Sequence, residues 1–132
     1  MFDNVANEEC AAAVRQAVPL WTDAGLEPSS GVIEEMGGGW VGEQALAISI
    51  YCSLAAQDDF RRGVLLAVNH GGDSGRTRAI TGNLLGLMLG VDAIPEIWLS
   101  ELELRDEIET MAVDLHRRFE DTDAWSKCYP GW

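Results

Sequence analysis

Apolar residues recur with helical spacing along most of the chain, and this periodicity constrains the fold more than any other feature. It is clearest between Trp40 and Ala55, where Val41, Ala45, Ile48 and Cys52 share one helical face. No segment alternates apolar and polar residues with the period of two expected of a half-buried strand. The sequence therefore predicts an all-α protein, with this apolar run as its central and most buried helix.

Further helices are predicted on both sides of the central one. Their ranges are 7–24, which contains Pro19 as a kink, 30–36, 59–68, 76–89 and 102–119, with a short helical turn starting at Pro95. Glycine-rich connectors separate them at 37–39 and 70–75, and the tail from 121 to 132 is predicted to be irregular. We expect one compact domain, residues 1–132, built as a bundle of about six helices.

Three glycines fall four residues apart at the helix predicted over 76–89, namely Gly82, Gly86 and Gly90. Residues at this spacing lie on one helical face, where glycine presents no side chain. We therefore expect a smooth strip against which a neighbouring helix packs closely.

The three cysteines, Cys10, Cys52 and Cys128, lie far apart and show no CxxC spacing. Cys10 and Cys52 fall inside apolar helical patterns, which suit buried thiols. The N-terminal string MFDNVANEEC lacks the basic and apolar runs of a signal peptide, and no segment has the roughly 18 apolar residues of a membrane span. These features predict a reduced, cytoplasmic protein that does not cross a membrane.

Acidic residues outnumber basic ones by 22 to 9, which gives a formal net charge of −13. A chain with this charge repels phosphate backbones and anionic lipid surfaces, so we expect no direct binding to nucleic acid. The acidity has two interpretations that stay open. It keeps a small protein soluble, or it attracts a protein partner with a basic surface.

The segment AVNHGGDSGRTRAITGNLLGLMLG, residues 67–90, resembles the C-terminal signature of the ADP-ribosylglycohydrolase family, which often reads NxGGDSDSTGAIAGNLLGA. The resemblance continues through GGGWVGEQALAISIYCSL before it and AIPEIWLSELELRD after it, so it covers residues 37–106. Family members are all-α enzymes that use two divalent ions, usually magnesium, to release ADP-ribose from a modified acceptor. The resemblance implies a truncated version of that fold.

The metal motif of the family is incomplete in this chain. The resemblance places the first aspartate of the motif at Asp73, but Gly75 replaces the second and Arg76 replaces a hydroxyl residue. In relatives, further metal ligands come from an N-terminal Thr-Asp-Asp segment. The nearest strings in this chain are Thr22–Ala24 and Asp121–Asp123, which we interpret as capping or turn residues and not as replacements for those ligands. Since magnesium needs several oxygen ligands, we expect Asp73 to be a vestigial, weak metal ligand and the chain to need no cofactor.

Two interpretations of the loop before residue 76 stay open. In the structural one, Asp73 caps the following helix and pairs with Arg76 or Arg78. In the functional one, the loop and the helix N-terminus still bind a phosphate of ADP-ribose. The candidate ligand-binding residues are Asn69, His70, Gly72, Ser74, Arg76 and Thr77.

Neither histidine is assigned a catalytic role. His70 has no nucleophile or orienting partner beside it in the sequence, and His116 lies at the basic end of a helix.

The hypothesis that follows is a catalytically degenerate protein that acts by stoichiometric protein binding. An acidic inhibitor, such as a phage-encoded anti-CRISPR protein, is one example, and a homodimer is another way to cover an apolar face. The alternatives are a magnesium-dependent ADP-ribosyl hydrolase completed by a partner chain or second copy, a non-hydrolysing ADP-ribose binder, and an immunity-type protein that blocks an ADP-ribosylating toxin.

Overall fold

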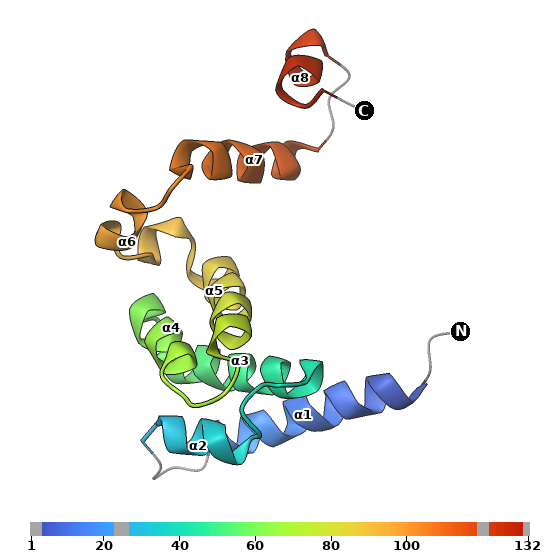
Figure 1. Cartoon of the computed structure of the whole chain (residues 1–132), viewed down its shortest axis with the longest axis vertical. Helices are drawn as coiled ribbons and strands as arrows, with labels where there is room; N and C mark the ends of the chain where they lie inside the picture. The colour runs from blue at the N-terminus through green and yellow to red at the C-terminus, as the bar shows by residue number, and fades with distance from the viewer. Residues whose placement is uncertain (1–3, 23–26, 119–121, 131–132) are drawn as a thin grey trace. The chain divides into compact units, whose positions relative to one another are not determined.

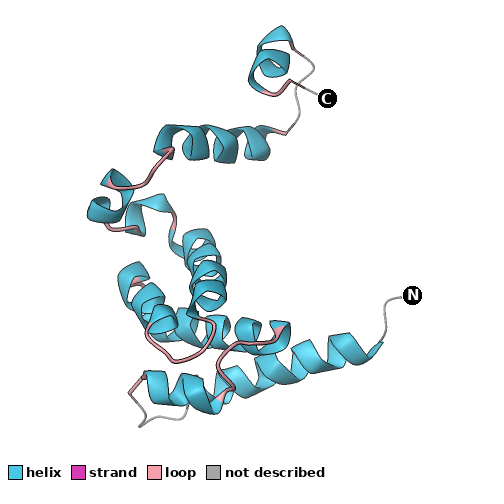
Figure 2. Cartoon of the chain, viewed as in Figure 1, coloured by secondary structure: helices cyan, strands magenta, loops and turns pink. Residues whose placement is uncertain are grey.

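A computed structural model of the chain describes residues 4–22, 27–118 and 122–130. It divides into two compact units, Met1–Pro95 and Glu96–Trp132, which are described separately (Figure 1). Within the described ranges the regular structure is entirely helical, which confirms the predicted all-α class (Figure 2). One domain over residues 1–132 stays a prediction.

The described residues of the first unit form five α-helices and a short 3-10 helix. They are α1 (Asn4–Thr22), α2 (Ser30–Glu35), α3 (Gly42–Ala56), α4 (Phe60–Val68), α5 (Ser74–Leu89) and η1 (Val91–Ala93). Each α-helix corresponds to one predicted from the sequence. Helix α3 packs against α1 and also against α4 and α5, which pack against each other (Figure 1).

Helix α3 is the centre of this unit, as its composition predicts. Nine of its fifteen residues are buried, and seven of the nine are alanine, serine or cysteine. Small side chains let neighbouring helices approach closely, while Ile48 and Tyr51 fill the core between them. The Ser49 hydroxyl donates hydrogen bonds to the carbonyls of Ala45 and Thr77, so it links α3 directly to α5.

The strip of Gly82, Gly86 and Gly90 was predicted to pack closely against a neighbouring helix, and this prediction is wrong. A Cβ atom added at Gly82, Gly86 or Gly90 would meet nothing within 4 Å in the structure. Close packing occurs instead at Gly63 of α4, where an added Cβ would lie 2.6 Å from Leu85 Cδ1 and 2.7 Å from Ala56 Cβ. The four-residue spacing identified a shared helical face but not the element opposite it.

Gly63→Ala is therefore expected to destabilise the first unit by about 2 kcal/mol, since both neighbours must move from a packed core. Gly82→Ala is the matched control in α5. It should raise the free energy of unfolding by about 0.5–1 kcal/mol, because alanine fills open space and favours the helix. Urea unfolding followed by circular dichroism measures both variants, and equal effects would contradict the packing at Gly63.

The thiol prediction is correct for Cys52 and wrong for Cys10. Cys52 is buried in α3, whereas Cys10 is exposed on α1, as is Cys128 of the second unit. Cys10 belongs to an apolar helical pattern, but its position on α1 is not covered by a neighbour in the described part of the chain.

Burial raises the pKa of the Cys52 thiol to about 12. In the unfolded chain the thiol loses its proton near pH 9, while the folded chain keeps it protonated. The stability that this group contributes is therefore complete below about pH 9 and is lost as the pH rises toward 12, by about 1.4 kcal/mol per pH unit. Chemical unfolding between about pH 8 and 11 should show this slope in the native sequence and a shallower one in Cys52→Ala. Identical slopes would contradict the assignment. Burial is the main cause that raises the pKa of Tyr51, and Cys52 raises it further, so Cys52→Ala also removes this smaller contribution and makes the slope shallower in the same direction.

The second unit contains α6 (Glu96–Ser100), α7 (Arg105–Arg117) and α8 (Asp123–Cys128). The irregular tail predicted for 121–132 is wrong where α8 forms, because Thr122 caps this helix by accepting a hydrogen bond from the Trp125 amide. The Tyr129 hydroxyl donates to Asp114 of α7 at 2.8 Å. Helix α8 brings the described α-helices to eight, rather than about six.

None of the helices in the described ranges is long and apolar enough to cross a bilayer.

Candidate functional site

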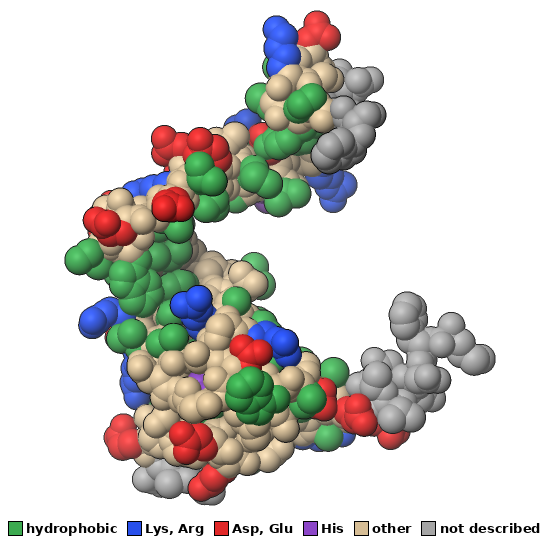
Figure 3. Space-filling model, viewed as in Figure 1, with side chains coloured by type: hydrophobic (Ala, Val, Ile, Leu, Met, Phe, Trp, Pro, Cys, Tyr) green, Lys and Arg blue, Asp and Glu red, His purple; other side chains and the backbone are tan. Residues whose placement is uncertain are grey.

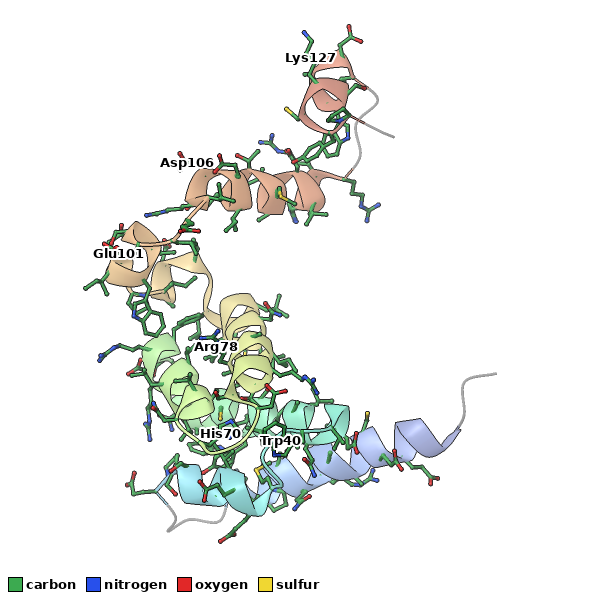
Figure 4. The ribbon with its side chains drawn as sticks, viewed as in Figure 1. Trp40, His70, Arg78, Glu101, Asp106 and Lys127 are labelled. Carbon is green, nitrogen blue, oxygen red and sulfur yellow. The ribbon has the colours of Figure 1, made fainter. Side chains whose placement is uncertain are left out.

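The segment that carries the family resemblance forms a loop between the end of α4 and the start of α5. Figure 4 shows His70 in this loop and Trp40 in the loop that precedes α3. Two hydrogen bonds join the loops: the Asp73 amide donates to the Gly38 carbonyl at 2.8 Å, and Arg76 Nη1 donates to the Trp40 carbonyl at 3.3 Å. The candidate site is thus built from two loops of the first unit.

Asp73 is engaged by Arg76 through both of its carboxylate oxygens. Asp73 Oδ1 accepts a hydrogen bond from the Arg76 backbone amide at 3.1 Å and so caps α5. Asp73 Oδ2 lies 3.3 Å from Arg76 Nε, and this ion pair is partly exposed to solvent. The predicted cap and the predicted pairing with Arg76 are both confirmed.

Thr77 is the buried centre of the site. Its hydroxyl donates to the Ala67 carbonyl at 2.8 Å and lies 2.9 Å from His70 Nε2. His70 Nδ1 accepts a hydrogen bond from the Gly72 amide at 3.1 Å, so Nδ1 carries no proton and Nε2 donates to Thr77. His70 therefore connects the loop to α5 through hydrogen bonds at both of its ring nitrogens.

The three glycines before Trp40 allow the two loops to meet. Gly37, Gly38 and Gly39 all have positive φ, and Gly38 and Gly39 are buried. A Cβ on Gly39 would lie 2.8 Å from Thr77 Cγ2, and a Cβ on Gly72 would overlap the Gly38 carbonyl. The sequence predicted only a connector here, although three consecutive glycines were the available signal for this close approach.

The remaining candidates lie at the edge of this arrangement. Asn69 is the C-cap of α4 and donates from Nδ2 to the Leu65 carbonyl at 2.6 Å. The Ser74 amide donates to the Gly72 carbonyl at 2.9 Å. His116 lies on the exposed surface of α7 in the second unit. The loop brings together His70, Gly72, Asp73, Arg76 and Thr77; ligand binding by any of them stays a prediction.

The residues present do not fit the two-ion site that the resemblance implies. Asp73 Oδ1 already accepts a hydrogen bond from the Arg76 amide, Asp73 Oδ2 is ion-paired with Arg76 Nε, and Gly75 has no side chain to contribute. Across the ranges that the structure describes, no three His, Cys, Asp or Glu side chains are grouped closely enough to hold a metal ion. The guanidinium group of Arg76 would also repel a cation at this position.

Comparison with known proteins gives one consistent family. A model of the ADP-ribosylglycohydrolase family matches residues 2–124. ADP-ribosylhydrolase ARH3 of Homo sapiens is 27% identical over 99 residues, which is 67% of this chain and 27% of that protein. An ADP-ribosyl-dinitrogen reductase glycohydrolase of Rhodospirillum rubrum is 44% identical over 52 residues, 39% of this chain and 18% of that protein.

ADP-ribosylarginine hydrolase Tri1 of Serratia proteamaculans is 36% identical over 58 residues, 44% of this chain and 16% of that protein. The chain spans about a quarter of the length of the ARH3 relatives that it matches. No solved structure matches the chain significantly.

Proposed function

The chain belongs to the ADP-ribosylglycohydrolase family, and we propose that it is a non-catalytic member that acts by stoichiometric binding to a protein partner. One observation carries the proposal: both carboxylate oxygens of Asp73 are held by Arg76, where a working site would direct them toward metal ions. Gly75 leaves no second carboxylate at the helix start. Without these oxygens a pair of divalent ions has too few ligands here.

The charge of the chain supports a partner with a basic surface. Acidic side chains are spread over the face drawn in Figure 3 and occur in both units. In the second unit they include Glu101 and Asp106, which are labelled in Figure 4. One protein of this kind would be an inhibitor that binds the basic surface of a nucleic-acid-handling machine, such as a phage anti-CRISPR protein. Only the net charge of −13 supports this more specific function.

A second candidate function is a magnesium-dependent hydrolase completed by another chain. It is favoured by the length comparison, since the matched region is 27% of human ARH3 and leaves room for ligands supplied elsewhere. This alternative requires Asp73 to leave its ion pair with Arg76 and to face the completing chain.

Magnesium titration by calorimetry separates the two functions. The native chain is expected to show no saturable binding at micromolar concentrations. In the double variant Gly75→Asp with Arg76→Ser, one carboxylate is added and the competing cation is removed, so magnesium affinity should rise at least about tenfold.

The matching activity assay measures release of ADP-ribose from a modified protein, with the native chain and with Asp73→Asn. Asparagine still caps α5, so this variant removes the charge without removing the cap. No magnesium-stimulated release in either protein supports the non-catalytic function. Release by the native chain that is lost in Asp73→Asn overturns it in favour of the hydrolase.

Partner binding is tested by capture from a bacterial lysate at low and moderate salt, followed by measurement of stoichiometry. A one-to-one complex that weakens as salt rises agrees with a basic partner. Recovery of no partner at either salt concentration contradicts stoichiometric binding.

A further inference from the structure

A pocket of about 590 Å³ lies in the first unit, between the residues that start α2 and one face of α4. This volume is within the range typical of small-molecule sites. Arg61 and Arg62 line it from the first turn of α4, and Ser29 lines it from the start of α2. Pro28 and Leu65 supply apolar surface to the same pocket.

The charge of the pocket is opposite to that of the chain. Two of the nine basic residues line it, in a protein whose net charge is −13. Arg76 and Arg105 each form ion pairs with carboxylates. Among the described residues, no carboxylate forms an ion pair with Arg61 or Arg62. Asp59 also lines the pocket, but its Oδ1 accepts from the Arg62 backbone amide at 2.9 Å as the cap of α4.

The walls of the pocket are attached to the buried core. The backbone of Ser29 lies beside the hydroxyl of Tyr51, which is buried in α3. On the opposite wall, Phe60 is buried and Gly63 packs against Ala56, which fixes the first turns of α4. The backbone of both walls is therefore fixed to the core, while the side chains of Arg61 and Arg62 are exposed and pay the ordering penalty when a ligand binds.

We infer that this pocket binds a small organic phosphate monoester. Two guanidinium groups on adjacent residues offer planar sets of N–H donors that suit a phosphate dianion. Pro28 and Leu65 then contact an apolar part of the same ligand. The inference stands on the pocket alone and is independent of the loop at Asp73.

Calorimetry and amide NMR with phenyl phosphate, inorganic phosphate and phenol test the arginine side and the apolar side of this pocket separately. Phenyl phosphate should bind most tightly and should shift the amides of Ser29 and of the first turn of α4. The double variant Arg61→Gln with Arg62→Gln should weaken both phosphates at least about tenfold. Leu65→Asn should weaken phenyl phosphate and leave inorganic phosphate unchanged.

The matched control is the double variant Arg78→Gln with Arg117→Gln, which makes the same change in net charge outside the pocket. It should reduce phosphate affinity less than twofold. Equal weakening in the two double variants would mean general electrostatic attraction and would overturn the inference. So would the absence of saturation with phenyl phosphate, or shifts centred on Ser74 to Thr77 at the start of α5.

Discussion

Gly72→Ala is expected to lower the free energy of unfolding by about 3 kcal/mol or more. The added Cβ would overlap the Gly38 carbonyl, and both atoms belong to backbone that cannot move independently. The Asp73 amide is hydrogen-bonded to that same carbonyl at 2.8 Å, so relieving the overlap also breaks a buried link between the two loops. Urea unfolding of the native chain and the variant, followed by circular dichroism, measures the loss.

Gly71→Ala is the matched control, one residue earlier in the loop. Its added Cβ would lie 3.6 Å from Glu34 Oε1, an ordinary contact with a flexible side chain, so the change should stay within about 1 kcal/mol. If Gly72→Ala fails to fold, Gly71→Ala should still fold normally. Similar stability in the two variants would contradict the close approach of Gly72 to Gly38.

Local signals account for the helices that the sequence predicts correctly. The caps of α4 and α5 are Asp59 and Asp73, and each accepts a backbone hydrogen bond from the residue three positions later. Helix α8 was missed because its six residues are too few to show a periodic pattern. Its signal was Thr122 followed by Asp123, a cap and a negative charge at a helix start.

Tertiary neighbours account for what the sequence does not predict. The spacing of Gly82 and Gly86 identifies one helical face, but nothing in the sequence states which element lies opposite. Gly63 belongs to no pattern, and its tight contacts with Ala56 and Leu85 come from two different helices. Close packing of this kind becomes visible only when the helices are placed against one another.

The contacts of the candidate site also fall into two groups: those that local spacing predicts and those that depend on tertiary packing. The pairing of Asp73 with Arg76 is a contact between residues three apart on one helix start, so spacing predicts it. The approach of Gly72 to Gly38 joins positions 34 residues apart and depends on how α3 packs against α5. The hydrogen bond between His70 and Thr77 likewise depends on the path of the loop between α4 and α5.

Thr77→Val is expected to lower the free energy of unfolding by about 3 kcal/mol. Valine has nearly the same shape, so the contact with Gly39 persists while the hydroxyl disappears. The Ala67 carbonyl loses its bond from Thr77, and His70 Nε2 loses the acceptor for its proton. Each polar group left without a partner in this part-buried site costs about 1–3 kcal/mol. Urea unfolding measures the total, and ¹⁵N NMR of the imidazole reports the tautomer of His70 directly.

Thr110→Val is the matched control, because Thr110 also bonds a carbonyl, that of Asp106 at 2.7 Å, but on the exposed surface of α7. Water replaces the lost bond there, so stability should change by less than about 0.5 kcal/mol. In native protein the imidazole spectrum should show an unprotonated Nδ1, as the bond from the Gly72 amide requires. An Nδ1-protonated ring, or equal losses in the two valine variants, would contradict Thr77 as the link that holds the loop on α5.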